Sequence, residues 1–564
     1  MKVTGREFRF GIHLPPVNRG DKDIIMVKEQ VHYEDGSIRP NIRYVQDFKR
    51  PFWVTKPNYR NHKEKKEWED LDKLTQYEAR ECDLSDMVAK IAGVRGNKVQ
   101  LKDINYQFPY VYGCDISATS LIHQLYRDKY PSTFSPYTIC VFDVETDCLC
   151  GKEIQNCEII IATVAFNNQV YTGVLKRIVK DYANPDQLIA KRRDYLLKEY
   201  IEKRNIQSKV EFFDSEIALV RAIMRQVHQW RPDFFVIWGI TFDMARLEDA
   251  CRRAGLHPKD LFSDPSVPRN RRVYRFKKGK DKRVTASGKV EPISPADQWH
   301  SIYCSSSFFV IDAMCVYKEI RSQFPDEVNY KLDTILELEL GIRKLKFKEA
   351  EMYEGTLEWH RYMQRYHPVE YVVYNMFDCI SIQELDEKTS DLSYKLPTFA
   401  INTDFANYKS STKRTTDHLY FYCLTQGKVI GSQAREPSNK DDAEEEINHV
   451  LSLKKWIVTL KPTYLIGEGA HCIEENPRLE TNVRKGVIDS DAISAYPSDI
   501  EACNVSKETT RREIIDIEGI TEDTFRLQNI GALAGHTNAI EYCTYMFGFP
   551  NLTELDELYE KEIG

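Results

Sequence analysis

The chain has 564 residues, of which 42% are hydrophobic and 29% are charged, and its formal net charge is −7. A chain of this length exceeds what one hydrophobic core accommodates, so we expect roughly three or four domains. It contains no apolar run of membrane-spanning length, which argues against a membrane protein. The small negative charge leaves nucleic-acid binding open, because a local basic patch is sufficient for it.

Residues 1–135 mix short strand patterns with the charged stretch "NHKEKKEWEDLDKL" (Asn61–Leu74). The alternating charges of that stretch predict a helix with a solvated face. From about Tyr137, the buried-strand run "YTICVFDVET" is followed by a strand pair about Asn167-Asn168 and by an amphipathic helix that begins at the cap Ser215.

The run "DFFVIWGITFD" predicts another buried strand, which ends at Asp243 directly before the helix "MARLEDACRRAGL". This alternation of strands and helices predicts an α/β domain with a largely buried sheet. The segment Arg269–Lys289 contains ten Lys or Arg and one acid, and part of it alternates as a hairpin would. We expect a loop for "EPISPADQWHSIYCSS" and helices for "YKLDTILELELGI" and "VEYVVYNMFDCISIQELDEKT".

The last part of the chain opens with the acidic insert Pro437–Glu446, which we expect to be an exposed excursion. The run "VIDSDAISAYPSDI" (Val487–Ile500) then starts a second α/β or α+β unit, and Asn551–Gly564 predicts an amphipathic helix.

The fourteen cysteines are scattered, and the start "MKVTGREFRF" does not resemble a secretory signal. We therefore expect reduced thiols and a cytoplasmic protein, in the host cytoplasm if the chain is viral. The tightest group is Cys148, Cys150 and Cys157, and its C-x-C-x6-C spacing fits no common zinc pattern.

Four carboxylates of the middle region are candidates for chemistry. Asp143 and Glu145 lie at i and i+2 of a strand, so both side chains share one face, where they must share a proton or bind cations. Oxygen ligands of this kind suit Mg²⁺ or Mn²⁺, although a surface pair is the plain alternative. Asp243 is equally consistent with a helix cap. Asp378 lies one turn after Tyr374 in an apolar helix, where an unpaired carboxylate is costly.

The order of these groups resembles the three motifs of DEDDy-type 3′→5′ exonucleases, in particular the proofreading domain of family B DNA polymerases. The motifs are "FDVET" (Phe142–Thr146), "TFD" (Thr241–Asp243) and "YNMFD" (Tyr374–Asp378). The resemblance implies that the four carboxylates hold two Mg²⁺ or Mn²⁺ ions for attack of water on the last phosphodiester, and that Tyr374 orients the water or the phosphate. The family usually has an Asn shortly before the second motif, where this chain has Gly239 or Ile240.

The basic segment Arg269–Lys289 falls between the second and third motifs. In family B polymerases of tailed phages, a β-hairpin in this interval helps to pass the primer end between sites. By that resemblance the segment contacts DNA phosphates without sequence preference, and the alternative is a solvated basic loop. The residues concerned are Arg271, Arg272, Arg275, Lys277 and Lys278.

The run "DAISAYPSDI" (Asp491–Ile500) resembles the first catalytic motif of the polymerase palm in the same family. The resemblance implies that Asp491 and the carbonyl of Ala492 bind a metal ion. It also implies a nucleotide site in which Tyr496 excludes a 2′-hydroxyl and three amides cradle the triphosphate, those of Ser494, Ala495 and Tyr496. Taken alone, the two acids Asp489 and Asp491 are ordinary turn residues.

The chain lacks the D-T-D turn that supplies the second palm carboxylate, and it lacks the fingers signature K-x3-N-S-x-Y-G. The resemblance therefore predicts the N-terminal portion of a bacteriophage-type family B DNA polymerase, in a split form whose second chain supplies the fingers, the remaining palm and the thumb. Its partners would be primer–template DNA and single-stranded 3′ ends, a dNTP only with the second chain, and a sliding clamp and single-strand-binding protein through the holoenzyme. No membrane partner is expected.

The resemblance also implies a multidomain α/β and α+β fold. A β-rich α+β domain spans 1–135, and a ribonuclease H-like exonuclease domain with a mixed sheet flanked by helices spans 136–395. A return segment with the acidic insert spans 396–465, and a partial palm spans 466–564. Two other functions stay open. One is a stand-alone 3′→5′ exonuclease with a relic palm, and the other is a non-catalytic DNA-binding subunit whose carboxylates only structure the domain.

Overall fold

The computed structural model describes residues 2–18, 20–62, 65–94, 100–284, 289–322, 327 and 329–434, together with two short strands further on. The chain divides into two compact units, Met1–Arg435 and Glu436–Gly564. In the second unit, β19 (Lys455–Ile457) and β20 (Ile514–Asp516) pair antiparallel. The acidic insert Pro437–Glu446 and the expected helix Asn551–Gly564 lie outside the described residues, and the four predicted domain ranges stay predictions.

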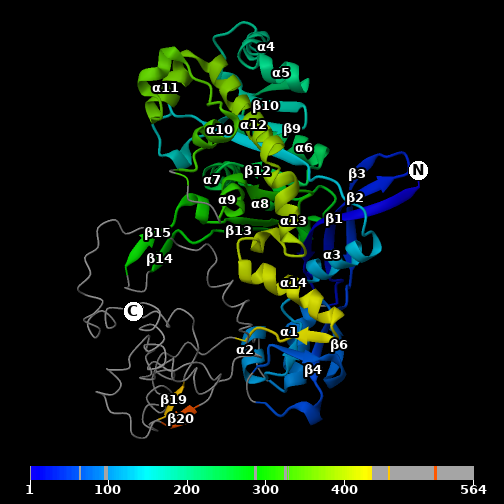
Figure 1. Cartoon of the computed structure of the whole chain (residues 1–564). Helices are drawn as coiled ribbons and strands as arrows, with labels where there is room; N and C mark the ends of the chain where they lie inside the picture. Colours follow the sequence, from blue (N-terminus) through cyan, green and yellow to red (C-terminus); the bar gives the residue numbers. More distant parts are fainter. Residues whose placement is uncertain are drawn as a thin grey trace, which may run out of the picture. The chain divides into compact units, whose positions relative to one another are not determined.

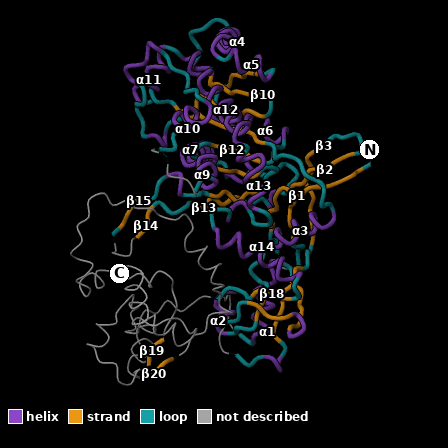
Figure 2. The backbone as a smooth tube through the Cα atoms, in the orientation of Figure 1, coloured by secondary structure: helices purple, strands orange, loops and turns teal. Residues whose placement is uncertain are grey.

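The first unit is a mixed α/β structure with a six-stranded mixed sheet flanked by helices, and it also contains small antiparallel sheets (Figures 1 and 2). The predicted α/β and α+β class is confirmed at this level. In the described part of the chain, none of the helices has the length and apolar character that crossing a bilayer requires.

The N-terminal residues form a three-stranded antiparallel sheet in the order β1-β2-β3, against which α3 (Ala118–Lys129) packs. A second antiparallel sheet has the order β6-β4-β7 and is accompanied by α1 and α2. The bounds of these elements are β1 (Val3–Leu14), β2 (Ile24–Tyr33), β3 (Ile38–Gln46), β4 (Arg50–Thr55), β6 (Leu74–Ala79), β7 (Val111–Tyr112), α1 (Leu84–Ala92) and α2 (Leu101–Gln107).

The helix predicted over Asn61–Leu74 is wrong. Within its described residues the chain forms the strand β5 (Trp68–Asp70), and β6 begins at Leu74. The partner of β5 is β18 (Lys428–Ile430), which follows α14 (Ser411–Thr425), so the chain returns there to the N-terminal residues. Alternating charges fit a two-stranded ribbon as well as a helix face, and only the distant partner decides between them.

The middle of the unit is built on the six-stranded sheet, whose order is β11-β10-β9-β8-β12-β17. Neighbours are antiparallel at β8/β9 and β9/β10 and parallel elsewhere. The predicted turn at Asn167-Asn168 is confirmed, with Asn167 at φ 52°. The strands are β8 (Ile139–Thr146), β9 (Ile159–Phe166), β10 (Gln169–Leu175), β11 (Gln207–Phe213), β12 (Phe234–Ile237) and β17 (Phe309–Asp312).

One face of this sheet is covered by α6 (Glu216–Trp230), the helix predicted to begin after Ser215. Val144, Ala162 and Gly173 are paired across β8, β9 and β10, so they share a face. A Cβ atom on Gly173 would lie 2.9 Å from Cγ of Leu219 in α6, so this row faces α6 at close approach. The residues on either side of Val144 therefore face the opposite side of the sheet.

Other helices and short strands complete the unit. The helices predicted over "YKLDTILELELGI" and "VEYVVYNMFDCISIQELDEKT" are confirmed as α10 and α12. The bounds are α4 (Pro185–Leu196), α5 (Lys198–Arg204), α7 (Ile240–Arg253), α8 (Pro258–Phe262), α9 (Ala313–Ile320), α10 (Leu332–Leu340), α11 (Leu357–Tyr366), α12 (Pro368–Thr389), α13 (Leu396–Ala400), β13 (Tyr274–Lys277), β14 (Lys282–Val284), β15 (Val290–Pro292) and β16 (Ser301–Cys304).

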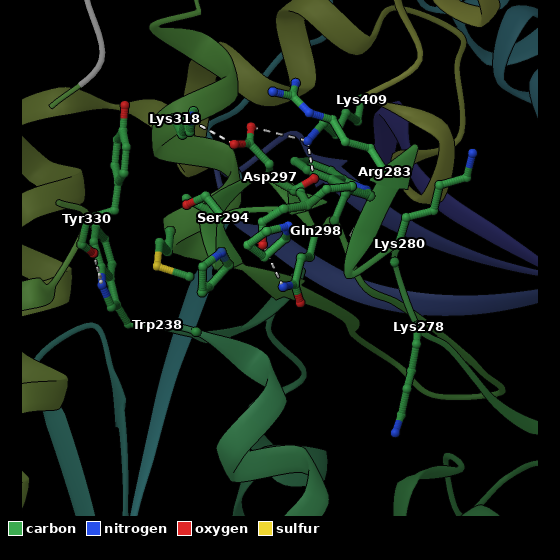
Figure 3. A pocket seen from close by; sticks show the side chains of 18 of the residues that line it. Trp238, Lys278, Lys280, Arg283, Ser294, Asp297, Gln298, Lys318, Tyr330 and Lys409 are labelled. Atoms are coloured by element: carbon green, nitrogen blue, oxygen red, sulfur yellow. Dashed lines mark hydrogen bonds and ion pairs between the residues drawn. The ribbon is translucent and has the colours of Figure 1, made fainter. Parts of the chain in front are cut away.

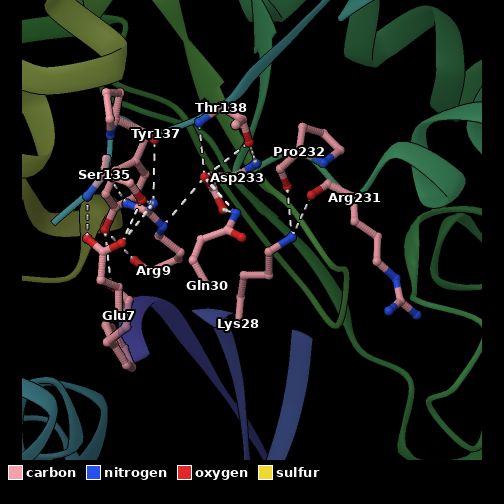
Figure 4. Close-up of polar contacts among 12 residues, drawn as sticks. Glu7, Arg9, Lys28, Gln30, Ser135, Tyr137, Thr138, Arg231, Pro232 and Asp233 are labelled. Atoms are coloured by element: carbon pink, nitrogen blue, oxygen red, sulfur yellow. Dashed lines mark hydrogen bonds and ion pairs between the residues drawn. The ribbon is translucent and has the colours of Figure 1, made fainter. Parts of the chain in front are cut away.

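Buried polar groups join the N-terminal strands to the start of β12 (Figure 4). Asp233 is fully buried, accepts a hydrogen bond from Gln30 Nε2 (3.1 Å) and pairs with Arg9 (3.6 Å). Lys28 Nζ donates to three backbone carbonyls, those of Arg231, Pro232 and Ser307. Burial lowers the pKa of Lys28 to about 8. Because each of these groups would be costly to bury alone, the network fixes how the strands meet the sheet.

Candidate active site

Strand β8 presents Asp143 and Glu145 to helix α12, on the face of the sheet opposite α6. Their predicted common face is confirmed by their partners on this one helix. Asn375 Nδ2 donates a hydrogen bond to Asp143 Oδ2 over 2.6 Å, and the Tyr371 hydroxyl donates one to Glu145 Oε2. Asn375 and Tyr371 are fully buried, so α12 fixes both carboxylates by hydrogen bonds from the interior of the unit.

The same helix carries Tyr374 and Asp378, one turn apart as predicted. Both contact Lys344, whose Nζ lies 2.6 Å from Asp378 Oδ2 and donates to the Tyr374 hydroxyl over 3.2 Å. Lys344 belongs to the loop after α10, and sequence reasoning missed it. It is one of several cations in "IRKLKFKEA", where no periodicity separates a buried lysine from a solvated one.

The strand predicted to end at Asp243 is wrong in its length. β12 ends at Ile237, Gly239 takes the N-cap position with φ +79°, and Asp243 lies in the first turn of α7. β12 pairs with β8 only as far as Val141, which leaves the amide of Val144 open to another acceptor. Asp243 Oδ1 accepts from that amide (3.2 Å), so Asp243 lies beside the segment of β8 that carries the other two acids.

The early start of α7 has a cause far along the chain. Asp312, the last residue of β17, accepts hydrogen bonds from the amides of Gly239 (3.2 Å) and Ile240 (2.9 Å). These amides belong to the unpaired first turn of a helix, which a carboxylate satisfies well. Because its φ is +79°, Gly239 is a backbone position that favours glycine or asparagine.

A second group of side chains surrounds Glu145 and also escaped sequence reasoning. His360 of α11 lies with Nδ1 2.8 Å from the Tyr371 hydroxyl and 3.6 Å from Glu145 Oε2. Gln364, one turn later, donates to the carbonyl of Thr146 over 2.7 Å. Nothing in the sequence of α11 distinguishes these two residues from ordinary polar residues of an amphipathic helix.

The pKa values of Asp143, Asp243 and Asp378 are all raised. Burial raises the pKa of Asp143 well above its ordinary value, and the charges of Asp243, Asp378 and Glu145 add to it. Burial raises the pKa of Asp243 to about 8 and that of Asp378 to about 6, with Lys344 opposing the second shift. Burial lowers the pKa of Lys344, but the nearby charges, led by Asp378, outweigh it and raise this pKa well above its ordinary value.

This charge balance favours a bound cation. Four carboxylates face one close ammonium group, and within the described residues Oδ1 of Asp378 is buried without a hydrogen-bond partner. In the same part of the chain, no three His, Cys, Asp or Glu side chains converge closely enough to hold an ion. The residues thus match a divalent cation in charge and in donor type. In this structure, however, their oxygens are spaced more widely than the ligands of one ion.

A cavity of about 1490 Å³ opens where α7 begins, and Trp238 and Gly239 line it (Figure 3). Its lining is basic, and the predicted DNA-binding residues Lys277 and Lys278 belong to it. Figure 3 shows Lys278 and Lys280 extending away from Asp297, which holds the two cations Lys318 (2.8 Å) and Lys409 (3.5 Å).

The other predicted DNA-binding residues lie elsewhere. Arg271 donates to the carbonyl of Lys22 (2.8 Å), and Arg272 donates to the carbonyl of Val267 (3.0 Å) and to Asp260 (3.3 Å). These two arginines hold the segment to the body of the unit, whereas Arg275 is exposed on β13.

The hairpin expected within Arg269–Lys289 lies only partly in that segment, because its second strand begins at Val290. β14 pairs with β15, whereas β13 pairs with β16. The loop predicted over "EPISPADQWHSIYCSS" is therefore wrong, because that stretch contains β16 and the end of β15. The strand that pairs with β13 is β16, which lies beyond the basic segment, and local periodicity does not reveal such a distant partner.

The residues of the predicted palm motif lie outside the described residues. They are Asp491, Ala492, Ser494, Ala495 and Tyr496. The candidate site is therefore the group formed by Asp143, Glu145, Asp243 and Asp378 with Tyr374 and Lys344. No protein-family model matches the chain, and a search of curated proteins finds no matching relative.

Proposed function

We propose that the first unit is a 3′→5′ exonuclease with a ribonuclease H-like fold, and that it is the proofreading part of a replicative family B DNA-directed DNA polymerase. One observation carries the proposal. Asp143 and Glu145 on β8, Asp243 on α7 and Asp378 on α12 lie close enough for their charges to act on one another, although Asp378 follows Asp143 by 235 positions in the sequence. Buried carboxylates that raise one another's pKa are typical of functional sites.

The four carboxylates would hold two divalent ions, Mg²⁺ or Mn²⁺. When bound, such ions activate a water molecule and stabilise the leaving 3′ oxygen during in-line attack on a phosphodiester. Asn375 and Tyr371 prepare the site, because each fixes the orientation of one β8 carboxylate by a hydrogen bond from α12. Preorganisation of this kind lowers the cost of reaching the reactive geometry.

Tyr374 is suited to orient the substrate. Burial raises the pKa of its phenol well above the ordinary value, so it keeps its proton at neutral pH. Its oxygen accepts from Lys344, which leaves the O–H free to donate to a phosphate oxygen or to the attacking water. Lys344 places a positive charge at the same spot, where a phosphodiester would bring negative charge.

The substrate in this proposal is the single-stranded 3′ end of DNA. Phe242, the neighbour of Asp243, is 42% exposed and offers a face on which a base can stack. The exposed lysines of the cavity suit contacts with phosphates, which carry affinity without sequence preference.

The test is a time course with the full chain, a 5′-labelled single-stranded oligonucleotide and Mg²⁺. We expect stepwise shortening from the 3′ end, loss of the reaction in EDTA, and loss of it in Asp143→Asn, which keeps the shape of the side chain. Asp186→Asn, at an exposed position of α4, is the matched control and should cleave normally. A wild-type chain that cleaves with neither Mg²⁺ nor Mn²⁺ would overturn the proposal in favour of a non-catalytic DNA-binding subunit.

The polymerase part of the proposal concerns Asp491 and the residues around it. We propose that templated extension requires a second chain with the fingers, the remaining palm and the thumb. Mixing the chain with candidate second chains should restore primer extension, and Asp491→Asn should abolish it while leaving exonuclease activity unchanged. If no second chain restores extension while cleavage is normal, the chain is a stand-alone exonuclease.

A further inference from the structure

Two cysteines lie in contact in the loop that follows β8. Sγ of Cys150 and Sγ of Cys157 are 3.0 Å apart, and no other two sulfurs of the described cysteines lie within hydrogen-bonding distance. The ends of the loop are fixed, because the amide of Asp147 donates to the carbonyl of Glu158 over 2.9 Å. A disulfide bond has a sulfur–sulfur distance of about 2.05 Å, so the two atoms need to approach by only about 1 Å.

One arginine lies near the pair. Arg246 of α7 is 7% exposed, and within the described part of the chain its Nε and Nη1 have no hydrogen-bond partner. Burial lowers the pKa of Arg246, and a charge on the nearby Cys157 opposes this shift. Its Nη2 pairs with Asp249 over 2.9 Å, so part of its charge is balanced, and the buried remainder of the guanidinium lies near Cys157.

The two thiols differ in their environment. Cys157 is buried, and burial together with the neighbouring Cys150 raises its pKa to about 12, so it keeps its proton. Cys150 is half-buried and is the more accessible of the two to a small oxidant. Cys150 is therefore suited to react first, and Cys157 to close the bond.

We propose that Cys150 and Cys157 are a redox modification site, at which a peroxide produces a reversible intramolecular disulfide. The Cys150 thiolate attacks one oxygen of hydrogen peroxide, the O–O bond breaks, and a sulfenic acid and hydroxide form. The Cys157 sulfur then attacks the sulfenic sulfur, and the S–O bond breaks with release of water. In total two thiols lose two protons and two electrons, and one peroxide becomes two waters.

The loop is joined to the candidate active site by hydrogen bonds. The amide of Cys148 donates to Gln364 Oε1 (2.9 Å), and Gln364 Nε2 lies 3.5 Å from the Tyr371 hydroxyl, which in turn holds Glu145. A disulfide two residues beyond Cys148 would shift this chain of contacts. We therefore expect the oxidised protein to cleave DNA about tenfold more slowly, a consequence that rests on the proposed function.

The experiment oxidises the full chain with a small excess of hydrogen peroxide, blocks free thiols with N-ethylmaleimide and analyses non-reduced peptides by mass spectrometry. We expect the loss of two labelled thiols, a cross-linked peptide that contains Cys150 and Cys157, and full reversal by dithiothreitol. Cys150→Ser should leave Cys157 open to labelling in the unfolded digest, and Cys82→Ser, at a half-buried cysteine elsewhere, should change nothing. A disulfide between other cysteines, a link between two chains, or sulfinic acid at Cys150 without a cross-link would overturn the proposal.

Cleavage rates of the oxidised and reduced protein test the consequence separately. Oxidation should slow the wild type and leave the Cys150→Ser/Cys157→Ser double variant at its reduced rate. If the cross-link forms and the wild-type rate is unchanged, control of the site is refuted while the modification stands. If the reduced wild type does not cleave at all, the proposed function fails, and the mass measurement still decides the disulfide.

Discussion

The ammonium of Lys344 lies 2.6 Å from a carboxylate oxygen of Asp378, across 34 residues of sequence. This contact ties the loop after α10 to α12 and brings a positive charge to a group of four carboxylates. The Lys344 side chain is 27% exposed, whereas that of Asp378 is 4% exposed. Removal of the lysine would therefore leave a buried acid without its cation, which is more costly than the loss of a surface pair.

The variant Lys344→Met keeps most of the side-chain stem and removes the charge. We expect the free energy of unfolding to fall by roughly 1–2 kcal/mol, below the usual cost for a fully buried pair because water reaches part of the lysine. We expect the cleavage rate to fall by about tenfold, which corresponds to about 1.4 kcal/mol of lost stabilisation. Urea denaturation and single-turnover cleavage measure the two effects.

Lys346→Met is the matched control, two residues away. Lys346 is 51% exposed and pairs with Glu354 on the surface over 2.6 Å, so both measured values should stay close to those of the wild type. Equal effects in the two variants would show that general charge, and not the contact with Asp378, determines the outcome.

Gly239 gives a prediction that concerns the backbone alone. Its φ is +79°, and a Cβ atom there would meet only Met314 Cε at 3.8 Å, so an alanine fits the space but strains the backbone. We expect Gly239→Ala to lower the free energy of unfolding by roughly 1–2 kcal/mol. Gly239→Asn should cost less, because asparagine adopts this conformation more readily. Thermal and urea unfolding compare the variants, and an asparagine variant as unstable as the alanine one would refute the backbone explanation.

The strand that carries Asp143 and Glu145 could be predicted because its information is local. An apolar run that ends in two acids at alternate positions defines both the strand and their common face. The hairpin at Asn167 and the helix around Asp378 were equally readable from turn residues and from helical period. These elements assign three of the four carboxylates to a strand or a helix before any tertiary contact is considered.

The start of α7 could not be predicted, because its cause lies in another strand. The residues after Ile237 continue an apolar run, and only the carboxylate of Asp312, 72 residues after Ile240, shows that the chain turns into a helix there. Lys344 and Asn375 escaped notice for a related reason. Each is an ordinary residue type in its own segment, and its role exists only in the contact with a distant carboxylate.

The raised carboxylate pKa values predict how stability depends on pH. Asp243 rises from an ordinary value of 3.8 to about 8, so the folded state binds more protons than the unfolded state between these values. The free energy of unfolding should therefore fall as the pH rises from about 4 to about 8 in EDTA. A divalent cation replaces these protons, so its stabilising effect should be larger at pH 8 than at pH 5.5.

Thermal unfolding followed by circular dichroism at the two pH values, with EDTA or with Mg²⁺, measures this effect. Asp243→Asn removes the titrating group, so it should raise the melting temperature in EDTA at pH 8 and reduce the increment from Mg²⁺. Identical increments from Mg²⁺ at both pH values in the wild type would contradict a cation site built from these carboxylates.

The lysines of the cavity predict a salt dependence for DNA binding. Lys278 and Lys280 are exposed, line the cavity and extend away from Asp297 (Figure 3), so we expect each to neutralise one phosphate of a single strand. Replacement of both by Gln should weaken binding of a single-stranded oligonucleotide. It should also reduce the slope of log affinity against log salt concentration by about 1.4, since each contact with a single strand contributes about 0.7.

Fluorescence anisotropy over a series of salt concentrations, in Ca²⁺ or EDTA to prevent cleavage, measures that slope. Lys198→Gln with Lys209→Gln removes the same charge from exposed positions on α5 and β11 and should leave the slope unchanged. Because both double variants change the net charge equally, a difference between them isolates the place of the lysines from the total charge. If the two slopes fall by the same amount, the cavity is not where the strand binds, and the two lysines are ordinary solvated residues of the segment between β13 and β14.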